Sequence, residues 1–501
     1  MRSLLLSALV ATLCVADASD RILPGSLPGW NGPQDMYAGY INVNSSHGRN
    51  LFYWLVESAG DPSNDPLVLW TNGGPGCSGI AGGLFSELGP FFPNTDGSLG
   101  LTPNPYSWTS SANVIFIEQP SGVGFSFSDT PADYTTGDYQ SAADVYAFLL
   151  SFMERYPQYA NRTLYLSGES YGGHYVPSFA KTIVEGNAAG VHPRINLAGF
   201  LVGNAWTVAE LDNVGAVDFW LSRTAISQDI HDGIIATCNM SDVGPLAAGR
   251  VRAEADWEVA QGLSAPLRPL GFTPLFDAAM GVAKVSGGAN CDGWSNQGFG
   301  LLSGIDIYDV YDNVCTASTP SSSVALSPIA ATKTPTATAT AKTLPDSNNA
   351  AGCSQTFDAC RDDKTSDYLN TPAVKEAIHA NASIVWRECS NVIDYSRFDL
   401  LSSMLPVYNE LIAAKLRILV YSGDVDAIVP SIGSRAWIAA LNSDLVSPIR
   451  AWTLDGQIGG WTTQYAGLNF TTVRNAGHFV PELQGSRALA LFNAFINNLP
   501  L

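Results

Sequence analysis

Short runs of apolar residues, bounded by glycine or polar residues, recur along this chain. They lie at 67–70, 114–117, 164–166, 197–202 and 418–421. Apolar runs of this length without polar alternation are typical of strands that are buried on both faces, as in a parallel sheet. The pattern therefore predicts core strands of a largely parallel sheet.

Between these runs the apolar residues recur at spacings of three and four. In residues 140–155, for example, Val145, Phe148 and Phe152 fall on one side of a helix. Strands that alternate with helices of this kind predict an α/β core.

The alternation of strands and helices stops after Asn204 and returns in the last third of the chain. We interpret 206–316 as an inserted cap region and 317–350, which is rich in Ser, Thr, Ala and Pro, as a low-complexity linker open to processing. The linker has almost no large apolar side chain, so it cannot offset the entropy of ordering. The core is then expected in two parts, 19–205 and 351–501.

Residues 1–18 have a basic start, a short apolar run and an Ala-Asp-Ala ending, which is the pattern of a cleaved secretory signal. The apolar run is too short to span a bilayer. A buried helix is the alternative, but no amphipathic repeat continues after Ala18. We therefore expect a protein of the secretory pathway, either extracellular or in a vacuole or lysosome.

Cysteines and glycosylation sequons agree with that route. Seven cysteines follow the signal, without a Cys-x-x-Cys pair or a histidine cluster of metal-ligand spacing, so we expect disulfides and no metal. Three disulfides and one odd thiol are possible. The Asn-x-Ser/Thr sequons are at Asn44, Asn161, Asn239, Asn381 and Asn469.

The formal net charge of −20 argues against partners that are themselves negatively charged. Nucleic acids and anionic membranes require a basic face, so we expect neither as a partner once the signal is removed. The size, 501 residues with 46% hydrophobic residues, allows one large domain with an insertion. Whether the protein is a monomer or a homodimer stays open.

The strongest chemical signal is Gly168-Glu-Ser-Tyr-Gly172, directly after an apolar run. A Gly-x-Ser-x-Gly turn between a strand and a helix is a nucleophile elbow, and this makes Ser170 the candidate nucleophile. We expect Gly168 and Gly172 to be required because the sharp turn leaves no room for side chains beside the serine. His174, one helical turn later, is expected to pack or cap rather than react.

A serine nucleophile needs a base, and the base needs an orienting carboxylate. In this type of elbow the acid and the histidine follow the serine in the chain. The 418–421 strand is followed by two carboxylates, Asp424 and Asp426, either of which fits the orienting role. Among the six histidines, His478 lies after that strand in a loop and is the candidate base.

The loop after the 67–70 strand, Asn72-Gly-Gly-Pro-Gly-Cys-Ser78, offers backbone N–H groups to an oxyanion. The second donor is expected to be the amide of Tyr171, the residue after the nucleophile. A phosphate-binding loop is the alternative, but the Gly-Lys-Ser/Thr ending of a P-loop is missing.

Taken together, the motifs resemble those of the serine carboxypeptidases. The matching segments, in order and over nearly all of the mature chain, are Trp70-Thr-Asn-Gly-Gly-Pro-Gly-Cys-Ser78, Glu118-Gln-Pro with Gly122-Val-Gly-Phe-Ser126, Gly168-Glu-Ser-Tyr-Gly172, Gly423-Asp-Val-Asp-Ala427 and Gly477-His-Phe-Val-Pro481. The resemblance implies an α/β-hydrolase core with a mixed, mostly parallel sheet flanked by helices, plus an inserted cap region. It implies a hydrolase that removes single amino acids from the C-termini of peptides or proteins, without a cofactor.

Residue roles follow from the same resemblance. The triad would be Ser170, Asp426 and His478, because the family's Gly-x-x-Asp pattern selects Asp426 over the other aspartate. The amides of Gly74 and Tyr171 would form the oxyanion hole. The terminal carboxylate of the substrate would be held by Trp70, Asn72, Gly73 and Glu169. Cys77 would pair with Cys389.

The carboxylate site has a consequence for pH. Glu169 can hydrogen-bond a substrate carboxylate only when one of the two acids keeps a proton, so we expect an acid pH optimum. An acyltransferase or esterase of the same fold is the alternative, although such relatives often carry aspartate at the position of Glu169. A secreted binding protein without catalysis is a third possibility. Gly79, Ser121 and the segment around Asn204 depart from the family pattern and leave the side-chain preference open.

Overall fold

The computed structural model describes residues 19–96, 98–242, 290–315 and 358–501. Two predicted segments, the signal at 1–18 and the linker at 317–350, lie outside the described residues. Within the described part of the chain, no helix is long and apolar enough to cross a membrane.

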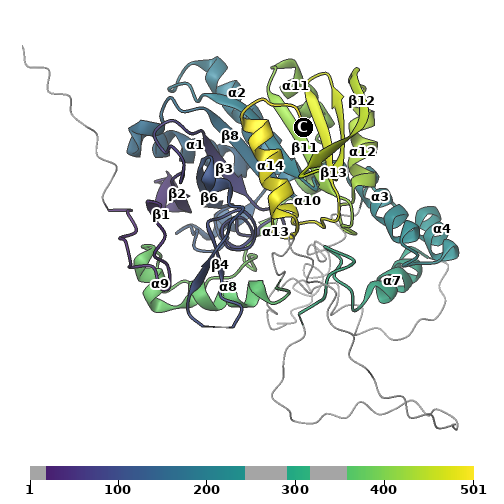
Figure 1. Cartoon of the computed structure of the whole chain (residues 1–501), viewed down its shortest axis with the longest axis horizontal. Coiled ribbons are helices and arrows are strands. Elements are labelled where there is room, and N and C mark those ends of the chain that lie inside the picture. The colour runs from purple at the N-terminus through teal and green to yellow at the C-terminus, as the bar shows by residue number, and fades with distance from the viewer. Residues whose placement is uncertain (1–18, 97, 243–289, 316–357) are drawn as a thin grey trace, which may run out of the picture.

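A ten-stranded mixed sheet forms the centre of the molecule (Figure 1). Its strands, in spatial order, are β1 (Met36–Asn44), β2 (Arg49–Val56), β6 (Asn113–Glu118), β3 (Leu67–Thr71), β8 (Leu164–Glu169), β9 (Leu197–Gly203), β11 (Arg417–Gly423), β14 (Leu468–Val473), β13 (Gln457–Tyr465) and β12 (Leu445–Leu454). The six strands from β6 to β14 run parallel. The pairs at both ends of the sheet are antiparallel.

The predicted apolar runs are the central parallel strands. They correspond to β3, β6, β8, β9 and β11, and the α/β prediction is confirmed. The antiparallel strand β2 holds a further buried apolar run, at 51–56, which the prediction did not include, whereas β12 and β13 at the other end of the sheet carried no such signal. β12, for example, is exposed along most of its length, so its sequence lacks the continuous apolar run of a buried strand.

Helices cover both faces of the sheet. One face packs against α1 (Asp138–Arg155), α2 (Gly172–Ala189), α11 (Leu405–Ala413) and α12 (Ser431–Ala440). The other face packs against the π-helix η1 (Ile80–Glu87), α8 (Arg361–Asn370) and α14 (Gly485–Ile496), which crosses the sheet in Figure 1. The predicted helix at 140–155 is α1.

Side chains along each central strand serve the two faces alternately. In β3, Leu67 and Leu69 belong to the apolar core on the α1 side, whereas Val68 and Trp70 belong to the core on the α14 side. All four are fully buried. A strand that contributes to two cores has to be apolar at every position, which is why the sequence shows runs and not alternation.

The predicted insertion contains α3 (Ala209–Ser222), α4 (Gln228–Thr237) and α7 (Cys291–Leu302), which lie together at one side of the molecule (Figure 1). These helices share a third apolar cluster, which includes Phe219 and Trp220. A disulfide between Cys238 and Cys291 links α4 to α7. The boundaries of the insertion as a domain stay a prediction.

The remaining elements are short. They are β4 (Phe91–Pro93), β5 (Leu101–Pro103), β7 (Thr135–Thr136), β10 (Asp394–Tyr395), α9 (Pro372–Ala377), α10 (Arg397–Leu401), α13 (Val480–Leu483) and the 3-10 helices η2 (Trp108–Ser110), η3 (Pro131–Tyr134) and η4 (Pro157–Tyr159).

Candidate active site

Ser170 occupies the turn between β8 and α2. Its φ is 59°, in the left-handed region that side chains rarely adopt. The turn is held on both sides, because Ser170 N donates to Gly203 O at 3.0 Å and Trp206 N donates to Ser170 O at 2.9 Å. A strained residue that the surrounding hydrogen bonds hold in place is the geometry of a nucleophile elbow.

The crowding around this turn differs in part from the expectation. A Cβ at Gly168 would lie 2.5 Å from Thr71 O, so this glycine is required. At Gly172 the nearest atom would be 3.9 Å away, so the expectation for this residue is wrong. The crowded position is Gly173, where a Cβ would lie 2.1 Å from Trp206 O, because α2 approaches the loop after β9 one residue later.

His478 and Asp426 are paired. His478 Nδ1 lies 2.8 Å from Asp426 Oδ2, and both side chains are buried. Asp426 also accepts hydrogen bonds from Ile428 N at 2.8 Å and Val429 N at 3.2 Å. The other candidate acid, Asp424, accepts instead from Asn475 N at 2.6 Å. The pairing through Nδ1 leaves Nε2 of the imidazole for proton transfer.

Asn204 connects the acid to the elbow, a role that sequence reasoning missed. Its Nδ2 donates to Asp426 Oδ2 at 2.7 Å, and its Oδ1 accepts from Gly423 N at 3.0 Å. The residue before it, Gly203, is the one that binds Ser170 N. The only signal in the sequence was an amide residue directly after a buried strand, where the carboxyl ends of parallel strands meet.

The glycine-rich loop after β3 lies directly against the elbow. A Cβ at Gly73 would lie 2.4 Å from Tyr171 N and 2.8 Å from Ser170 Cβ. The next residue, Gly74, has a φ of 110°. Only glycines allow a backbone to approach this closely, which is what an oxyanion site built from backbone amides requires.

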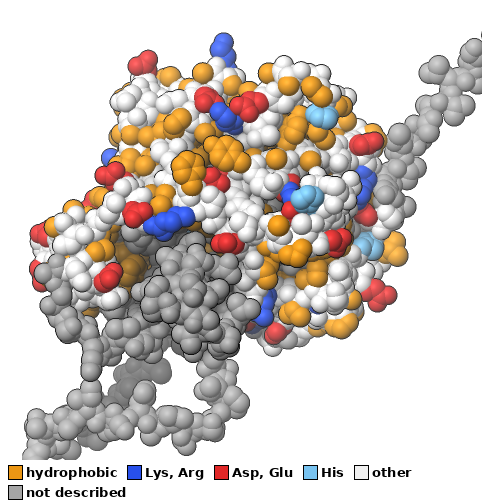
Figure 2. Space-filling view, turned by 180° about the vertical axis from the view of Figure 1, so that it is seen from behind, with side chains coloured by type: hydrophobic (Ala, Val, Ile, Leu, Met, Phe, Trp, Pro, Cys, Tyr) orange, Lys and Arg blue, Asp and Glu red, His pale blue; other side chains and the backbone are white. Residues whose placement is uncertain are grey.

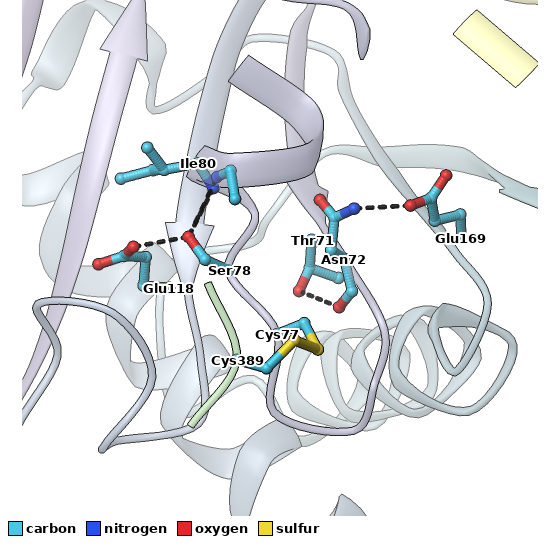
Figure 3. The surroundings of a disulfide bond; sticks show 9 residues. Thr71, Asn72, Cys77, Ser78, Ile80, Glu118, Glu169 and Cys389 are labelled. Atoms are coloured by element: carbon cyan, nitrogen blue, oxygen red, sulfur yellow. Dashed lines mark hydrogen bonds between the residues drawn. A yellow bond between two sulfur atoms is a disulfide. The ribbon is translucent and has the colours of Figure 1, made fainter. Parts of the chain in front are cut away.

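Three attachments hold this loop, and Figure 3 shows two of them, the disulfide and the bond from Ser78 to Glu118. Cys77 and Cys389 form a disulfide with their Cα atoms 4.0 Å apart, which is the pairing implied by the resemblance. Ser78 N donates to Glu388 O at 2.7 Å. Ser78 Oγ donates to the buried carboxylate of Glu118 at 2.6 Å. The loop is therefore fixed to the second half of the core as well as to β6.

A buried carboxyl pair lies beside the loop. Asn72 Nδ2 donates to Glu169 Oε1 at 2.6 Å and lies 3.3 Å from Glu87 Oε1 (Figure 3 shows the first of these bonds). Trp70 Nε1 donates to Asn72 Oδ1 at 2.7 Å and so fixes the orientation of the amide. Both glutamates are 1% exposed.

The two glutamates also contact each other, and this perturbs their pKa values. Burial raises the pKa of Glu87 to about 7. Burial, together with the neighbouring Glu87, raises the pKa of Glu169 well above its ordinary value. Two carboxyl groups in contact are stable only when they share a proton. Glu87 was missed by sequence reasoning, and its one signal is an acidic residue at the end of the apolar segment 80–87.

His174 lies away from the reactive atoms, as expected. Its Nδ1 is 3.0 Å from Asp138 Oδ2, its side chain is fully buried, and its ring stacks on Tyr171 with the centroids 4.6 Å apart. Its role is packing beneath the elbow.

The structure also shows the pairing of the other cysteines and the exposure of the sequons. Besides Cys77–Cys389 and Cys238–Cys291, a third disulfide joins Cys315 to Cys360, and Cys353 lies outside the described residues. Of the sequons, Asn161, Asn239 and Asn381 are exposed, and Asn44 and Asn469 are partly exposed.

No group of three His, Cys, Asp or Glu side chains suited to a metal ion exists in the described ranges. On the face drawn in Figure 2, lysine and arginine side chains lie singly or in small groups among acidic and apolar ones.

Comparisons with known proteins agree with this geometry. The family model described as serine carboxypeptidase matches residues 28–498. The chain belongs to the serine carboxypeptidase family. Serine carboxypeptidase 24 of Arabidopsis thaliana is 38% identical over 98% of this chain and 96% of its own length. Serine carboxypeptidase-like 26 of the same plant is 37% identical, over 96% of this chain and 94% of its own.

Among solved structures, the prohormone-processing carboxypeptidase Kex1(delta)p of Saccharomyces cerevisiae has a TM-score of 0.69. It is 21% identical, and the match covers 96% of each chain, so it shows the fold. This member of the serine carboxypeptidase family is therefore an α/β-hydrolase, and the family places it among the serine-type carboxypeptidase hydrolases.

Proposed function

We propose that this enzyme hydrolyses the C-terminal peptide bond of peptides or proteins in acid, and releases single amino acids through an acyl-enzyme. The observation that carries the proposal is the buried pair of Glu87 and Glu169, whose pKa values are raised and whose carboxyl groups both contact Asn72. Glu169 directly precedes Ser170 in the chain. A site of this kind recognises a free carboxylate, which an endopeptidase or a simple esterase has no need to bind.

In the proposed mechanism, His478 removes the proton from Ser170 Oγ as the oxygen attacks the scissile carbonyl. Asp426 keeps the imidazole oriented and stabilises the imidazolium that forms. The amides of Gly74 and Tyr171 donate to the oxyanion of the tetrahedral intermediate. His478 then returns the proton to the leaving amino acid, and water hydrolyses the acyl-enzyme by the same steps in reverse order.

Strand order supports this assignment. Ser170 follows β8, Asp426 follows β11 and His478 follows β14, and β8, β9, β11 and β14 are neighbours in the parallel part of the sheet. The carboxyl ends of parallel neighbours meet at one edge, which is where α/β enzymes carry their sites.

Substrate binding explains the acid preference. The carboxylate of the substrate would lie beside Asn72, Gly73, Glu169 and Trp70, where a protonated glutamate donates a hydrogen bond to it. As pH rises through about 7, Glu87 ionises and puts a negative charge beside the bound carboxylate. Binding should weaken above neutral pH.

The same chemistry suits the compartment that we propose. The three disulfides fit an oxidising environment, and the acid preference fits a vacuole or lysosome as well as an acidic extracellular space. Substrates would be peptide or protein C-termini, and neither nucleic acid nor membrane would be a partner.

The test is covalent labelling combined with substitution of the nucleophile. A fluorophosphonate should label Ser170 in the wild-type enzyme, and Ser170→Ala should lose both labelling and the release of C-terminal residues at pH 5. A peptide blocked as its C-terminal amide should be cut much more slowly than the free acid. Release of residues by Ser170→Ala, or equal cleavage of acid and amide, would contradict the proposal.

A further inference from the structure

A segment of the insertion lies between the two loops that carry the acid and the base. Residues 305–310 follow α7, and three backbone hydrogen bonds join them to the catalytic loops. Ala427 N donates to Ile307 O at 3.0 Å, Val310 N donates to Val425 O at 3.3 Å, and His478 N donates to Tyr308 O at 2.7 Å. The residues on either side of Asp426, and His478 itself, are thus bound to the insertion.

The packing at this junction is tight. A Cβ at Gly477 would lie 2.2 Å from Tyr308 O and 2.7 Å from Asp309 Cβ, so the loop of the base lies directly on the segment. The ring of Tyr308 meets the imidazole of His478 edge-on, with the centroids 5.1 Å apart and the planes at 63°. It also packs against Phe479 at 5.2 Å.

A second part of the insertion, α3, also contacts the loop that carries Asp426. Trp220, which is 1% exposed, donates its Nε1 proton to Ala427 O at 2.8 Å. Arg223 Nη2 donates to Asp424 O at 2.8 Å. The loop of the acid is therefore held between α3 and residues 305–310, both of which belong to the insertion.

Disulfides lie on both sides of the segment in the chain. Cys291, at the start of α7, is bonded to Cys238, and Cys315, beyond the segment, is bonded to Cys360, the residue directly before α8. The first bond holds the segment to the insertion and the second holds it to the second half of the core. A segment tied in this way can transmit the position of the insertion to the catalytic loops.

We propose that residues 305–310 are a positioning element for the acid–base pair, with Tyr308 as the positioning residue for His478. The inference rests on the proposed function, in which His478 is the general base. The Tyr308 carbonyl fixes the backbone of His478, and the Tyr308 ring limits the orientations of the imidazole. The insertion thereby acts on proton transfer, in addition to any effect on substrate entry.

The expected effect follows from geometry. A displacement of a catalytic group by about 1 Å can lower the rate about 100-fold. Tyr308→Leu keeps an apolar side chain but removes the flat ring from the imidazole. We expect it to lower kcat for a peptide about 10- to 100-fold with little change in KM, whereas Tyr308→Phe, which keeps the ring, should stay within about threefold of wild type.

The deciding measurement is the rate of inactivation by phenylmethanesulfonyl fluoride. This reagent is small and has no peptide groups, so its rate reports the activation of Ser170 and not the binding of a peptide. The rate constant does not depend on how much of the preparation is folded. Tyr308→Leu should react about 10-fold or more slowly than wild type, and Tyr308→Phe at nearly the wild-type rate. Leu301→Ala is the matched control, since Leu301 is 56% exposed on α7 in the same insertion.

Each outcome separates the alternatives. A raised KM with an unchanged inactivation rate would make Tyr308 a wall of the substrate site and overturn the inference. An unchanged inactivation rate with a lower melting temperature would make it purely structural and overturn it as well. Tyr308→Met serves in the same way if Tyr308→Leu does not fold. If the wild type itself is not labelled at Ser170, the proposed function fails, and not this inference alone.

Discussion

Replacing Glu87 with glutamine should move the alkaline limit of peptide hydrolysis. Glu87 is buried at the end of η1, in contact with Glu169, and burial raises its pKa to about 7. Glutamine has nearly the same shape and still contacts Asn72, but it cannot ionise. The variant therefore keeps the site neutral at pH values where the wild type gains a negative charge beside the bound carboxylate.

The magnitude follows from the pKa. The fraction of wild-type enzyme with a protonated Glu87 falls about tenfold for each pH unit above about 7, which is about 1.4 kcal/mol per unit. At pH 8.5 the wild type should have lost about 30-fold in kcat/KM for peptides through this group. Glu87→Gln should lose little until Glu169 ionises, and the pKa of Glu169 is itself raised well above its ordinary value.

The assay is a comparison of two substrates between pH 4 and pH 9. One is an N-blocked dipeptide with a free C-terminus, and the other is the ester of the same N-blocked residue, which has no carboxylate to bind. The ratio of their kcat/KM values removes the pH dependence of the chemical steps. This ratio should fall above pH 7 in the wild type and stay level in Glu87→Gln. Glu169→Gln should move the limit upward as well, with less effect on the ester.

Glu57→Gln is the matched control. Burial also raises the pKa of Glu57, but this residue lies far from Ser170. Glu57 follows β2, and because β2 is antiparallel to β6, the end of β2 lies at the amino ends of the parallel strands, whereas Ser170 lies at the carboxyl end of β8. The control should keep the wild-type profile. If Glu87→Gln gives the same ratio profile as the wild type, the ionisation of Glu87 does not govern carboxylate binding, and the reasoning is refuted.

Three further predictions test stability and the geometry of the site. The pKa values of Glu87 and Asp212 are raised to about 7 by burial, so the folded protein binds more protons than the unfolded chain between about pH 4.5 and 7. The melting temperature measured by scanning fluorimetry should therefore fall from pH 5 to pH 8, and a rise would contradict this. Asn204→Ala removes a hydrogen bond of about 1.5–3 kcal/mol to the carboxylate of Asp426 in the proposed triad. It should lower kcat about tenfold or more with KM little changed, and an effect on KM alone would argue against a positioning role of Asn204. Gly73→Ala forces a Cβ to within 2.4 Å of the amide after the nucleophile and should abolish activity, whereas Gly300→Ala, with open space around it in α7, should leave activity unchanged; an active Gly73→Ala enzyme would show that the loop and the elbow do not have to touch.

Much of the fold and part of the site could be read from the sequence, for a physical reason. The continuous apolar run that is buried on both faces in β3 and the spacing that buries one side of α1 are local properties of the chain. The position of the elbow at Ser170 could be read locally too, because a strand, the Gly-x-Ser-x-Gly motif and a helix follow one another within a short stretch of chain. The type of elbow gave the order of the acid and the base, and the family motif selected Asp426 over Asp424.

The local sequence pattern did not predict features that depend on contacts between distant segments or on exposure to solvent. The crowding at the elbow falls on Gly173 and not Gly172, since it comes from the loop after β9 and not from the turn itself. Edge strands such as β12 lacked a signal because solvent and not the core faces most of their side chains.

The sequence by itself determined the alternation of strands and helices, the nucleophile elbow and the family. Only the tertiary structure decided that Glu169 meets Asn72 across 97 residues, that Asn204 binds Asp426 across 222, and that Tyr308 packs on His478. The reason is that periodicity and turn chemistry act within a few residues, whereas these contacts depend on which strands become neighbours in the sheet and on where the insertion returns to it.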